Sequence, residues 1–155
     1  PVSTWNPLGV NCAPASAALP TVPADGWAKA EPLCPALPAG VTAPAEADFT
    51  NFAASGMGAE ADAWLLENAN LVNHLAVTGT ADAPIVFETA LDADHPHALT
   101  CLTIDAAEGS SLTVVQVVRG DAENGVSANL TRIRAAENSH VTLVQVQLLG
   151  SHARR

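Results

Sequence analysis

The sequence predicts an all-β fold: a right-handed parallel β-helix (solenoid) of about three rungs, preceded by a Pro/Ala-rich arm with short helices. Three observations lead to this prediction. From Leu65 onward valine, isoleucine, leucine and threonine dominate in short runs, which is typical of strands. Small polar residues separate these runs at equivalent places. Similar stretches recur at nearly constant spacing, beginning at Leu75, Leu102 and Thr131, as is typical of stacked units.

The N-terminal arm is expected to cover residues 1–63, which hold nine of the eleven prolines. Proline fixes φ and lacks a backbone N–H, so this part of the chain is expected to form only short elements. Short helices are predicted around Ala45–Phe52 and around Ala59–Glu67. Three large apolar side chains are expected to anchor the arm onto the body by burying area: Trp5, Trp27 and Phe49.

The β core is expected to cover residues 64–150, followed by a tail at 151–155. Each copy of the repeat holds a first strand, a tight turn and a second strand. The first strands are Leu75-Ala76-Val77, Leu102-Thr103-Ile104 and Thr131-Arg132-Ile133, and the second strands are Ile85-Val86-Phe87, Leu112-Thr113-Val114 and Val141-Thr142-Leu143. This alignment stacks Leu75 on Leu102 and Thr131, Ile85 on Leu112 and Val141, and Phe87 on Val114 and Leu143.

Polar segments divide the core at equivalent positions of each copy. Tight turns are predicted at Thr78–Pro84, Asp105–Ser111 and Arg134–His140, and longer connections at Asp92–Ala98 and Arg119–Ser127. A β-sandwich or jelly roll that uses the same strands as antiparallel hairpins is the alternative fold. The regular spacing of the turns favours the β-helix, and the absence of the hexapeptide repeat of left-handed β-helices favours the right-handed form.

Apolar and polar residues do not alternate regularly along the second strands of the repeats. Apolar residues occupy both odd and even positions in Val114–Val118 and Leu143–Leu148, and so point to both faces of the strand. We therefore expect either a corner in the chain or a sheet that is covered on both faces. The second arrangement would leave an apolar sheet face for a partner.

The charge balance excludes several partners. The formal net charge is −10, with only six lysine and arginine residues. Because a basic surface is needed to bind phosphate groups, neither nucleic acid nor an anionic membrane is expected as a partner. The sequence has no long apolar run typical of a membrane span and no signal-peptide pattern. Three cysteines without a CxxC spacing indicate reduced thiols and a cytoplasmic location: Cys12, Cys34 and Cys101.

Few residues are candidates for chemistry. His95, His97 and Cys101 offer imidazole and thiolate ligands for zinc or iron, and they are the weak candidates for a metal-binding β-domain. The acid pairs Asp92/Asp94 and Asp121/Glu123 lie in predicted connections, where solvated loops are expected. A glycosidase needs two carboxylates that flank a cleft. A carbohydrate-binding or carbohydrate-active β-helix domain is therefore kept only as an alternative.

Other polar residues have structural interpretations. Gln116 and Gln145 occupy the same position of successive repeats, so a stacked amide ladder is predicted. His74 and His140 are expected in turn-like segments with surface or capping roles. No catalytic residue is predicted.

The repeats resemble those of the SufB/SufD family of iron–sulfur cluster assembly proteins. The likeness runs from Trp64 to Gly150 and includes Leu66-Glu67-Asn68-Ala69, Ala83-Pro84-Ile85-Val86-Phe87 and the stretch from Ala135 to Gln145. Leu19–Trp27 is similar to the proline-containing segment that leads to a tryptophan in this family, although Ala28-Lys29-Ala30 departs from the family's basic-Tyr-Thr run.

This resemblance implies a right-handed β-helix that acts as a non-catalytic scaffold of the SufD type. The expected partners are an ABC-type ATPase subunit and a SufB-like sibling, with a homodimer through the β-helix sheet or edge as a further option. Family members are more than twice as long, and their cluster-related cysteine and histidine lie on later rungs, so no such role is carried over. No cofactor is expected in this chain itself, and an iron–sulfur cluster is expected only in the full complex.

Overall fold

The computed structural model describes residues 25–26, 28, 30–32, 36–45, 65–123 and 125–151. Trp5, Trp27, Phe49 and nearly all of the predicted helix at Ala45–Phe52 lie outside these ranges. Of the second predicted helix, only its last three residues are described, and they belong to a helical turn at 65–68. In the described ranges, no helix has the length and apolar character needed to traverse a lipid bilayer.

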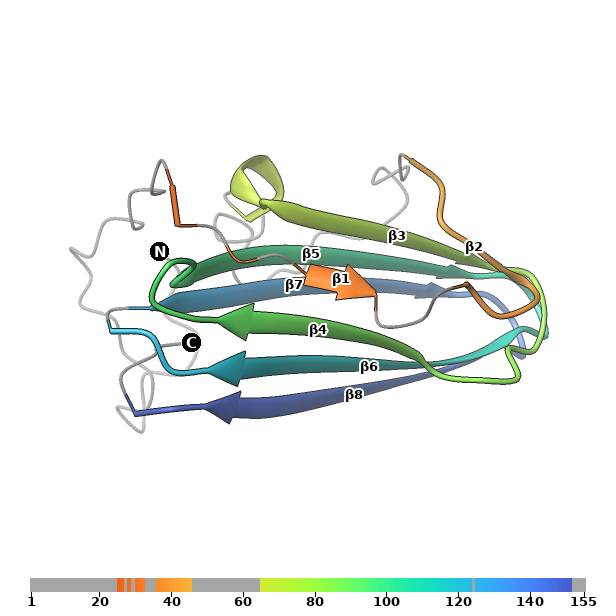
Figure 1. Cartoon of the computed structure of the whole chain (residues 1–155). Coiled ribbons are helices and arrows are strands. Elements are labelled where there is room, and N and C mark those ends of the chain that lie inside the picture. Colours follow the sequence, from red (N-terminus) through yellow and green to blue (C-terminus); the bar gives the residue numbers. More distant parts are fainter. Residues whose placement is uncertain are drawn as a thin grey trace, which may run out of the picture.

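The predicted all-β class is confirmed, because eight strands form two four-stranded sheets (Figure 1). Sheet A has the order β2-β3-β5-β7, and sheet B has the order β1-β4-β6-β8. The strands of sheet A are β2 (Val41–Thr42), β3 (Leu71–Val77), β5 (His97–Ala106) and β7 (Val126–Ala135). The strands of sheet B are β1 (Ala30–Pro32), β4 (Ile85–Leu91), β6 (Ser111–Gly120) and β8 (His140–Leu149).

From β3 to β8 the chain alternates between the two sheets, so that successive strands never pair with each other. Instead β3, β5 and β7 run parallel in sheet A, and β4, β6 and β8 run parallel in sheet B. Hairpins of an antiparallel sandwich are therefore not formed by these strands. Both sheets are open, and the short β2 and β1 pair antiparallel with β3 and β4 at one edge of each.

The period of the repeat is constant throughout both sheets. Leu75 pairs with Ile104, Ile85 with Val114 and Phe87 with Gln116. The predicted alignment of the first two copies is therefore wrong by two residues, which is one period of side-chain alternation along a strand. The predicted pairs between the second and third copies are confirmed: Leu102 with Thr131, Leu112 with Val141 and Val114 with Leu143. A shift by one strand period keeps every side chain on its own face, so hydrophobic alternation does not detect it.

The core lies between the facing sides of the two sheets. Sheet A contributes Leu75, Val77, Leu102, Ile104 and Ala106, and sheet B contributes Ile85, Phe87, Leu112 and Val114. These residues alternate with outward ones along each strand, as the period of two predicts. A second small cluster at the other end of the strands contains Ala28, Leu91, Ala98 and Ala122. The core is thus apolar at both ends of the strands, and polar side chains lie between.

The tight turns repeat in conformation as well as in position. Gly109 and Asn138 are equivalent, and both have a left-handed backbone, with φ of 68° and 57°. Glycine adopts this region without strain and asparagine tolerates it better than most residues. In each turn a serine hydroxyl donates to the carbonyl three residues earlier, Ser110 to Ala107 at 2.6 Å and Ser139 to Ala136 at 2.7 Å. The turns therefore occupy 107–110 and 136–139, inside the predicted segments.

Candidate functional site

The two edges of each sheet are formed by different kinds of strand, a short antiparallel strand at one edge and a long parallel strand at the other. At one edge β1 and β2 pair with β4 and β3, whereas β7 and β8 form the other edge of each sheet (Figure 1). In the part of the chain that the structure describes, no strand pairs with the outer side of β7 or β8. Each of these strands has ten residues, and an exposed row of backbone N–H and C=O groups is a template for another strand. We call the edges of β7 and β8 the open end.

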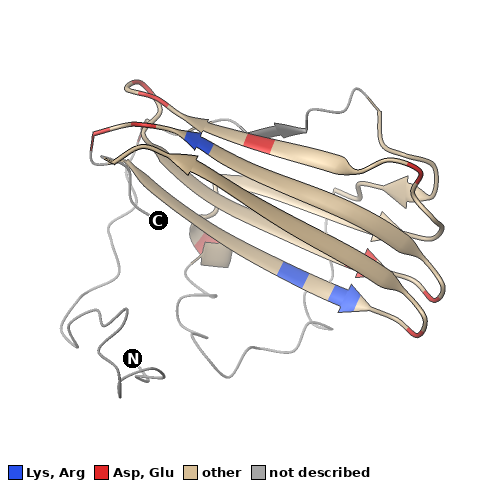
Figure 2. Ribbon diagram, turned by 90° about the horizontal axis from the view of Figure 1, so that it is seen from below, with Lys and Arg blue, Asp and Glu red and all other residues tan. Residues whose placement is uncertain are grey.

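Charge is distributed unevenly over the open end. Figure 2 shows acidic residues in the connections at both ends of the strands and two basic residues on β7, which are Arg132 and Arg134. The guanidinium of Arg134 pairs with the carboxylate of Asp105 one repeat earlier, with 2.7 Å between Nε and Oδ1. Strand β8 contains neither a charged residue nor a proline. Strand β8 therefore lacks two of the features that commonly protect an edge strand from pairing, a charged side chain and a proline.

The outward face of sheet B has an apolar patch that reaches the open end, beside the ion pair between Glu88 and Arg119. Val86, Val115 and Val144 are register partners on this face, and Val117 is paired with Val146. Exposure is greatest on β8, where Val144 is 41 % and Leu148 is 61 % exposed. The β6 and β8 strands run without interruption, so the predicted corner is not formed there. The apolar residues on both faces of the second strands instead reflect one face in the core and an apolar patch on the outward face.

Polar side chains form a ladder between the two sheets, in the middle of the strands. Gln145 Nε2 donates to Gln116 Oε1 at 3.0 Å, and Asn129 Nδ2 donates to Thr100 Oγ1 at 2.7 Å. The hydroxyl of Thr131 donates to Asn129 Oδ1 at 2.9 Å. The predicted stacking of Gln116 and Gln145 is confirmed. Since Gln145, Asn129 and Thr131 belong to β8 and β7, the ladder reaches the open end.

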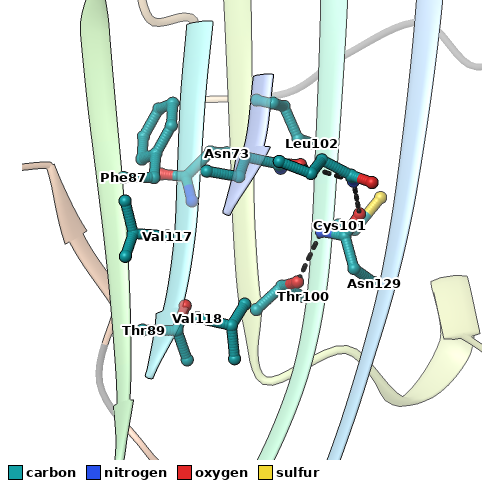
Figure 3. Close-up of a pocket in the computed structure, with 11 residues that line it drawn as sticks. Asn73, Phe87, Thr89, Thr100, Cys101, Leu102, Val117, Val118 and Asn129 are labelled. Carbon is teal, nitrogen blue, oxygen red and sulfur yellow. Dashed lines mark hydrogen bonds between the residues drawn. The ribbon is translucent and has the colours of Figure 1, made fainter. Parts of the chain in front are cut away.

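A small cavity lies along this ladder (Figure 3). Its volume is about 20 Å³, which is room for roughly one water molecule and not for a sugar or a cofactor. Its polar lining residues are Asn73, Thr89, Thr100, Gln116, Asn129 and Gln145. The arrangement serves the packing of the repeats and does not form a site for an organic ligand.

The three candidate metal ligands are not brought together. His95 lies in an exposed connection, with its Nδ1 at 3.1 Å from Asp92 Oδ1. His97 and Cys101 both belong to β5, four residues apart, which separates their Cα atoms by about 13 Å in an extended strand. Cys101 is buried, with only 1 % of its surface exposed. In the described ranges, no three His, Cys, Asp or Glu side chains lie close enough to hold a metal ion, and Cys12 and Cys34 fall outside those ranges.

The acid pairs lie in connections, as predicted, and the structure gives Asp92 a structural role. Its Oδ1 accepts the backbone N–H of His95 at 2.7 Å and that of Asp94 at 2.9 Å. The hydrogen bond from the His95 backbone, with smaller contributions from the His95 ring and the Asp94 backbone, lowers the pKa of Asp92. These bonds shape a turn that an aspartate commonly forms with its own backbone. Asp94, Asp121 and Glu123 are exposed, and none of these carboxylates lines the cavity.

His74 does not lie in a turn. It occupies the middle of β3 and is buried, and its Nδ1 lies 2.6 Å from the hydroxyl of Thr103, its register partner. Desolvation by burial lowers the pKa of His74, because it penalises the charged imidazolium. His140 is exposed at the start of β8, in agreement with the surface role predicted for it.

Sequence reasoning missed the polar members of the ladder other than the glutamines. Thr100 and Asn129 are also register partners, and a search for polar residues repeated one period apart would have found them. Asn73 pairs with Leu102, so no repeat pattern points to it.

No family model, curated protein or solved structure matches this chain. The similarity to the SufB/SufD family therefore rests on the residues and motifs quoted above.

Proposed function

We propose that this chain is a non-catalytic scaffold module, of the SufD type, that works in the cytosol by binding other proteins of an iron–sulfur cluster assembly complex. The observation that carries this proposal is the open end. Two ten-residue edge strands end the sheets there, β7 in sheet A and β8 in sheet B, and β8 has no charged residue. Backbone groups on such an edge bind a partner strand by extending the sheet, a common mode of protein recognition.

The fold that we propose for the module is a right-handed parallel β-helix. Support comes from the alternation of β3 to β8 between two sheets and from a register that advances by the same period at every parallel pair of strands. Each connection from one strand of sheet A to the next crosses through sheet B. Crossover connections between parallel strands are right-handed in nearly all known proteins, which favours this hand.

The expected partners are a SufB-like sibling and an ABC-type ATPase. A sibling with its own stacked repeats would extend both sheets across the open end and cover the exposed Leu148 and Val144. Any iron–sulfur cluster would then belong to the assembled complex. The small cavity and the scattered histidines give no support to either alternative, a carbohydrate-binding or carbohydrate-active domain or a metal-binding domain.

Co-purification tests the proposal. The tagged full chain would be expressed together with a SufB-like subunit and an ABC-type ATPase from the same source, and the captured proteins would be quantified. We expect both subunits to be retained. Leu148→Lys should reduce their recovery at least tenfold, because it places a charge on the edge strand at a side chain that is 61 % exposed.

Val72→Lys is the matched control. Val72 is 47 % exposed and lies on the outward face of β3, where it pairs with Cys101 of β5, on the side of sheet A away from the open end. This variant should retain both subunits. Recovery of neither subunit by the unmodified chain, or equal recovery by the two lysine variants, would contradict the proposal.

A further inference from the structure

An N-terminal part of the chain covers the edges of β3 and β4, at the end of the sheets opposite the open end. Strand β1 pairs antiparallel with Phe87–Thr89 of β4, and β2 pairs antiparallel with the last two residues of β3 (Figure 1). The other strand pairs in both sheets are parallel and belong to the repeat. The two short strands therefore lie outside the repeat. We call the described residues between Gly26 and Thr42 the N-terminal cap.

The N-terminal cap is also bound next to the start of β3. The Ala28 N–H donates to the His97 carbonyl at 2.7 Å, and the His97 N–H donates to the Gly26 carbonyl at 3.0 Å. Asn70, which directly precedes β3, adds a side-chain bond, because its Nδ2 donates to the Ala28 carbonyl at 3.1 Å. The same asparagine accepts the Leu99 N–H through Oδ1 at 2.8 Å. One side chain thus connects the N-terminal cap to the first residues of β5.

A further contact of the N-terminal cap lies at the other end of β3. The Thr78 N–H donates to the Gly40 carbonyl at 2.8 Å, next to the two residue pairs between β2 and β3. Gly40 has a φ of +78°, and a Cβ at this position would lie 3.1 Å from the Cα of Gly79. Glycine permits both this backbone conformation and this close approach. A strand added along the whole of β3 would therefore have to displace the N-terminal cap at both ends.

Strand β1 has features that hinder further pairing, and they contrast with β8 at the opposite edge of sheet B. Strand β1 has only three residues, among them Glu31 and Pro32, and β2 has only two residues. Short edge strands, charged residues and prolines all reduce pairing at an edge, and proline has no N–H to donate. Strand β8 has ten residues without a charge or a proline. The two edges of sheet B therefore differ in how readily they accept another strand.

Beneath the N-terminal cap, the edges of β3 and β4 match the open end in strand direction. Strands β3, β5 and β7 are parallel, and so are β4, β6 and β8. If the cap were absent, β3 and β4 of one copy could lie beside β7 and β8 of the next copy and continue both sheets with the same period. A head-to-tail contact that does not close on itself adds copies without limit.

We propose that the N-terminal cap blocks the edges of β3 and β4 and thereby limits the chain to one end at which a partner can extend the sheets. The inference rests on the proposed function, because it explains how the open end is kept for one sibling subunit and is not used for a growing row of copies. The contacts that hold the cap are few, since β1 and β2 pair over three and two residues. Substitutions in the cap should therefore release it without unfolding the repeats.

Two glycines of the N-terminal cap provide the test, in the full chain. Gly26 and Gly40 both have positive φ, and an added Cβ would lie 3.2 Å from the Pro96 ring at Gly26 and 3.1 Å from Gly79 at Gly40. Gly26→Val and Gly40→Val together should release the cap, because a branched side chain fits neither the backbone conformation nor the space. The average mass measured by light scattering should then rise about tenfold or more, because uncapped copies join head to tail.

Gly109→Val is the matched control. Gly109 also has a positive φ of +68°, but it lies in the tight turn between β5 and β6, away from the cap. This variant should keep the mass of the unmodified chain, since backbone strain alone does not uncover an edge. Circular dichroism should show that all variants keep their strands.

A disulfide gives a second test within one sequence. Thr42 and Ala76 are register partners on β2 and β3, close enough for a bond between two cysteines. Thr42→Cys and Ala76→Cys would be added to the double valine variant, with Cys12→Ser and Cys34→Ser. The oxidised chain should keep the mass of the unmodified protein, because β2 stays on the edge of β3. Reduction should allow the polymers to grow.

The outcomes separate this inference from the proposed function. A double valine variant with the mass of the unmodified chain would overturn the inference, whether or not amide hydrogen exchange at Ala76 and Val77 becomes faster. Polymers of Gly109→Val, or polymers that grow equally with the disulfide closed, would also overturn it. Addition of the SufB-like subunit should shorten the polymers, because it occupies the open end. Polymers that this subunit leaves unchanged would contradict the scaffold proposal and leave the role of the cap standing.

Discussion

Gln145 donates a 3.0 Å hydrogen bond from Nε2 to Oε1 of Gln116, the residue that lies one repeat earlier in the same sheet. This contact connects two parallel strands at a position where their neighbours are valines on either side. Valines pack equally well when one strand is shifted by two residues along the other. A buried or half-buried amide, in contrast, forms its hydrogen bond only when a suitable partner lies opposite it. The glutamine pair therefore helps to fix the register between β6 and β8.

Replacing one glutamine tests this role. Gln116→Leu should lower the free energy of unfolding by about 1 kcal/mol, because the hydrogen bonds that Gln116 accepts from Gln145 and, at 3.4 Å, from Thr131 are lost, while the amide of Gln145 still reaches water. Gln147→Leu, at an exposed position of β8, should change it by less than about 0.5 kcal/mol. Urea denaturation followed by circular dichroism measures both values, and equal effects would contradict the role of the ladder.

Two isoleucines that are register partners should differ in their contribution to stability. Ile104 is fully buried, and Ile133 is 40 % exposed at the open end. Ile104→Ala should cost about 3 kcal/mol, because it leaves a cavity in the core. Ile133→Ala should cost about 1 kcal/mol or less, since solvent already reaches the side chain. If the same denaturation experiments gave similar losses, the third copy of the repeat would be buried and the open end would be wrong.

Gly120 should tolerate no side chain. Its φ is +115°, and a Cβ at this position would lie 1.9 Å from the carbonyl oxygen of Leu91, its partner on β4. Gly120→Ala should therefore destabilise the protein by more than about 3 kcal/mol. Gly109→Ala is the control: its φ is +68° with no atom within 4 Å of the added Cβ, so only the left-handed backbone penalty of about 1–2 kcal/mol applies. Thermal unfolding of both variants should show this order, and the reverse order would contradict the close approach of β4 and β6.

His74 should make stability depend on pH. Its pKa is lowered in the folded protein by burial, so the unfolded state binds the proton more readily. Stability should be complete above the unfolded pKa of about 6.5 and should fall as the pH drops below it. His74→Asn should flatten this fall between pH 7 and pH 5, and His140→Asn at an exposed position should not. Unfolding curves that keep the same pH dependence in His74→Asn would show that His74 does not titrate in this way.

The features of the fold that depend on the local alternation of apolar and polar residues could be predicted from the sequence. Alternation placed Leu102, Ile104 and Ala106 on the inward face and Arg132 and Arg134 on the outward one, as the structure has them. The register between the first two copies did not follow. Leu75 resembles both Leu102 and Ile104, and only contacts between strands distinguish the two pairings.

The candidate site followed less well from the sequence. Histidine and cysteine were chosen for their chemistry, but an extended β5 separates His97 from Cys101, and His95 lies in a connection. His74 was expected in a turn-like segment, whereas its pairing with Thr103 places it within a strand. The open end depends on which strand lies at the edge of each sheet, and that order is a property of the whole fold.

The central claim is that the open end, and β8 in particular, is where this protein binds another chain. Residue-resolved amide hydrogen exchange tests it most directly, on the purified full chain alone and again after addition of the SufB-like sibling. We expect amides of β8 between Leu143 and Leu149 to exchange more slowly on association, while those of β4 and β6 stay unchanged. Unchanged exchange in β8, together with new protection elsewhere in the described chain, would contradict the claim.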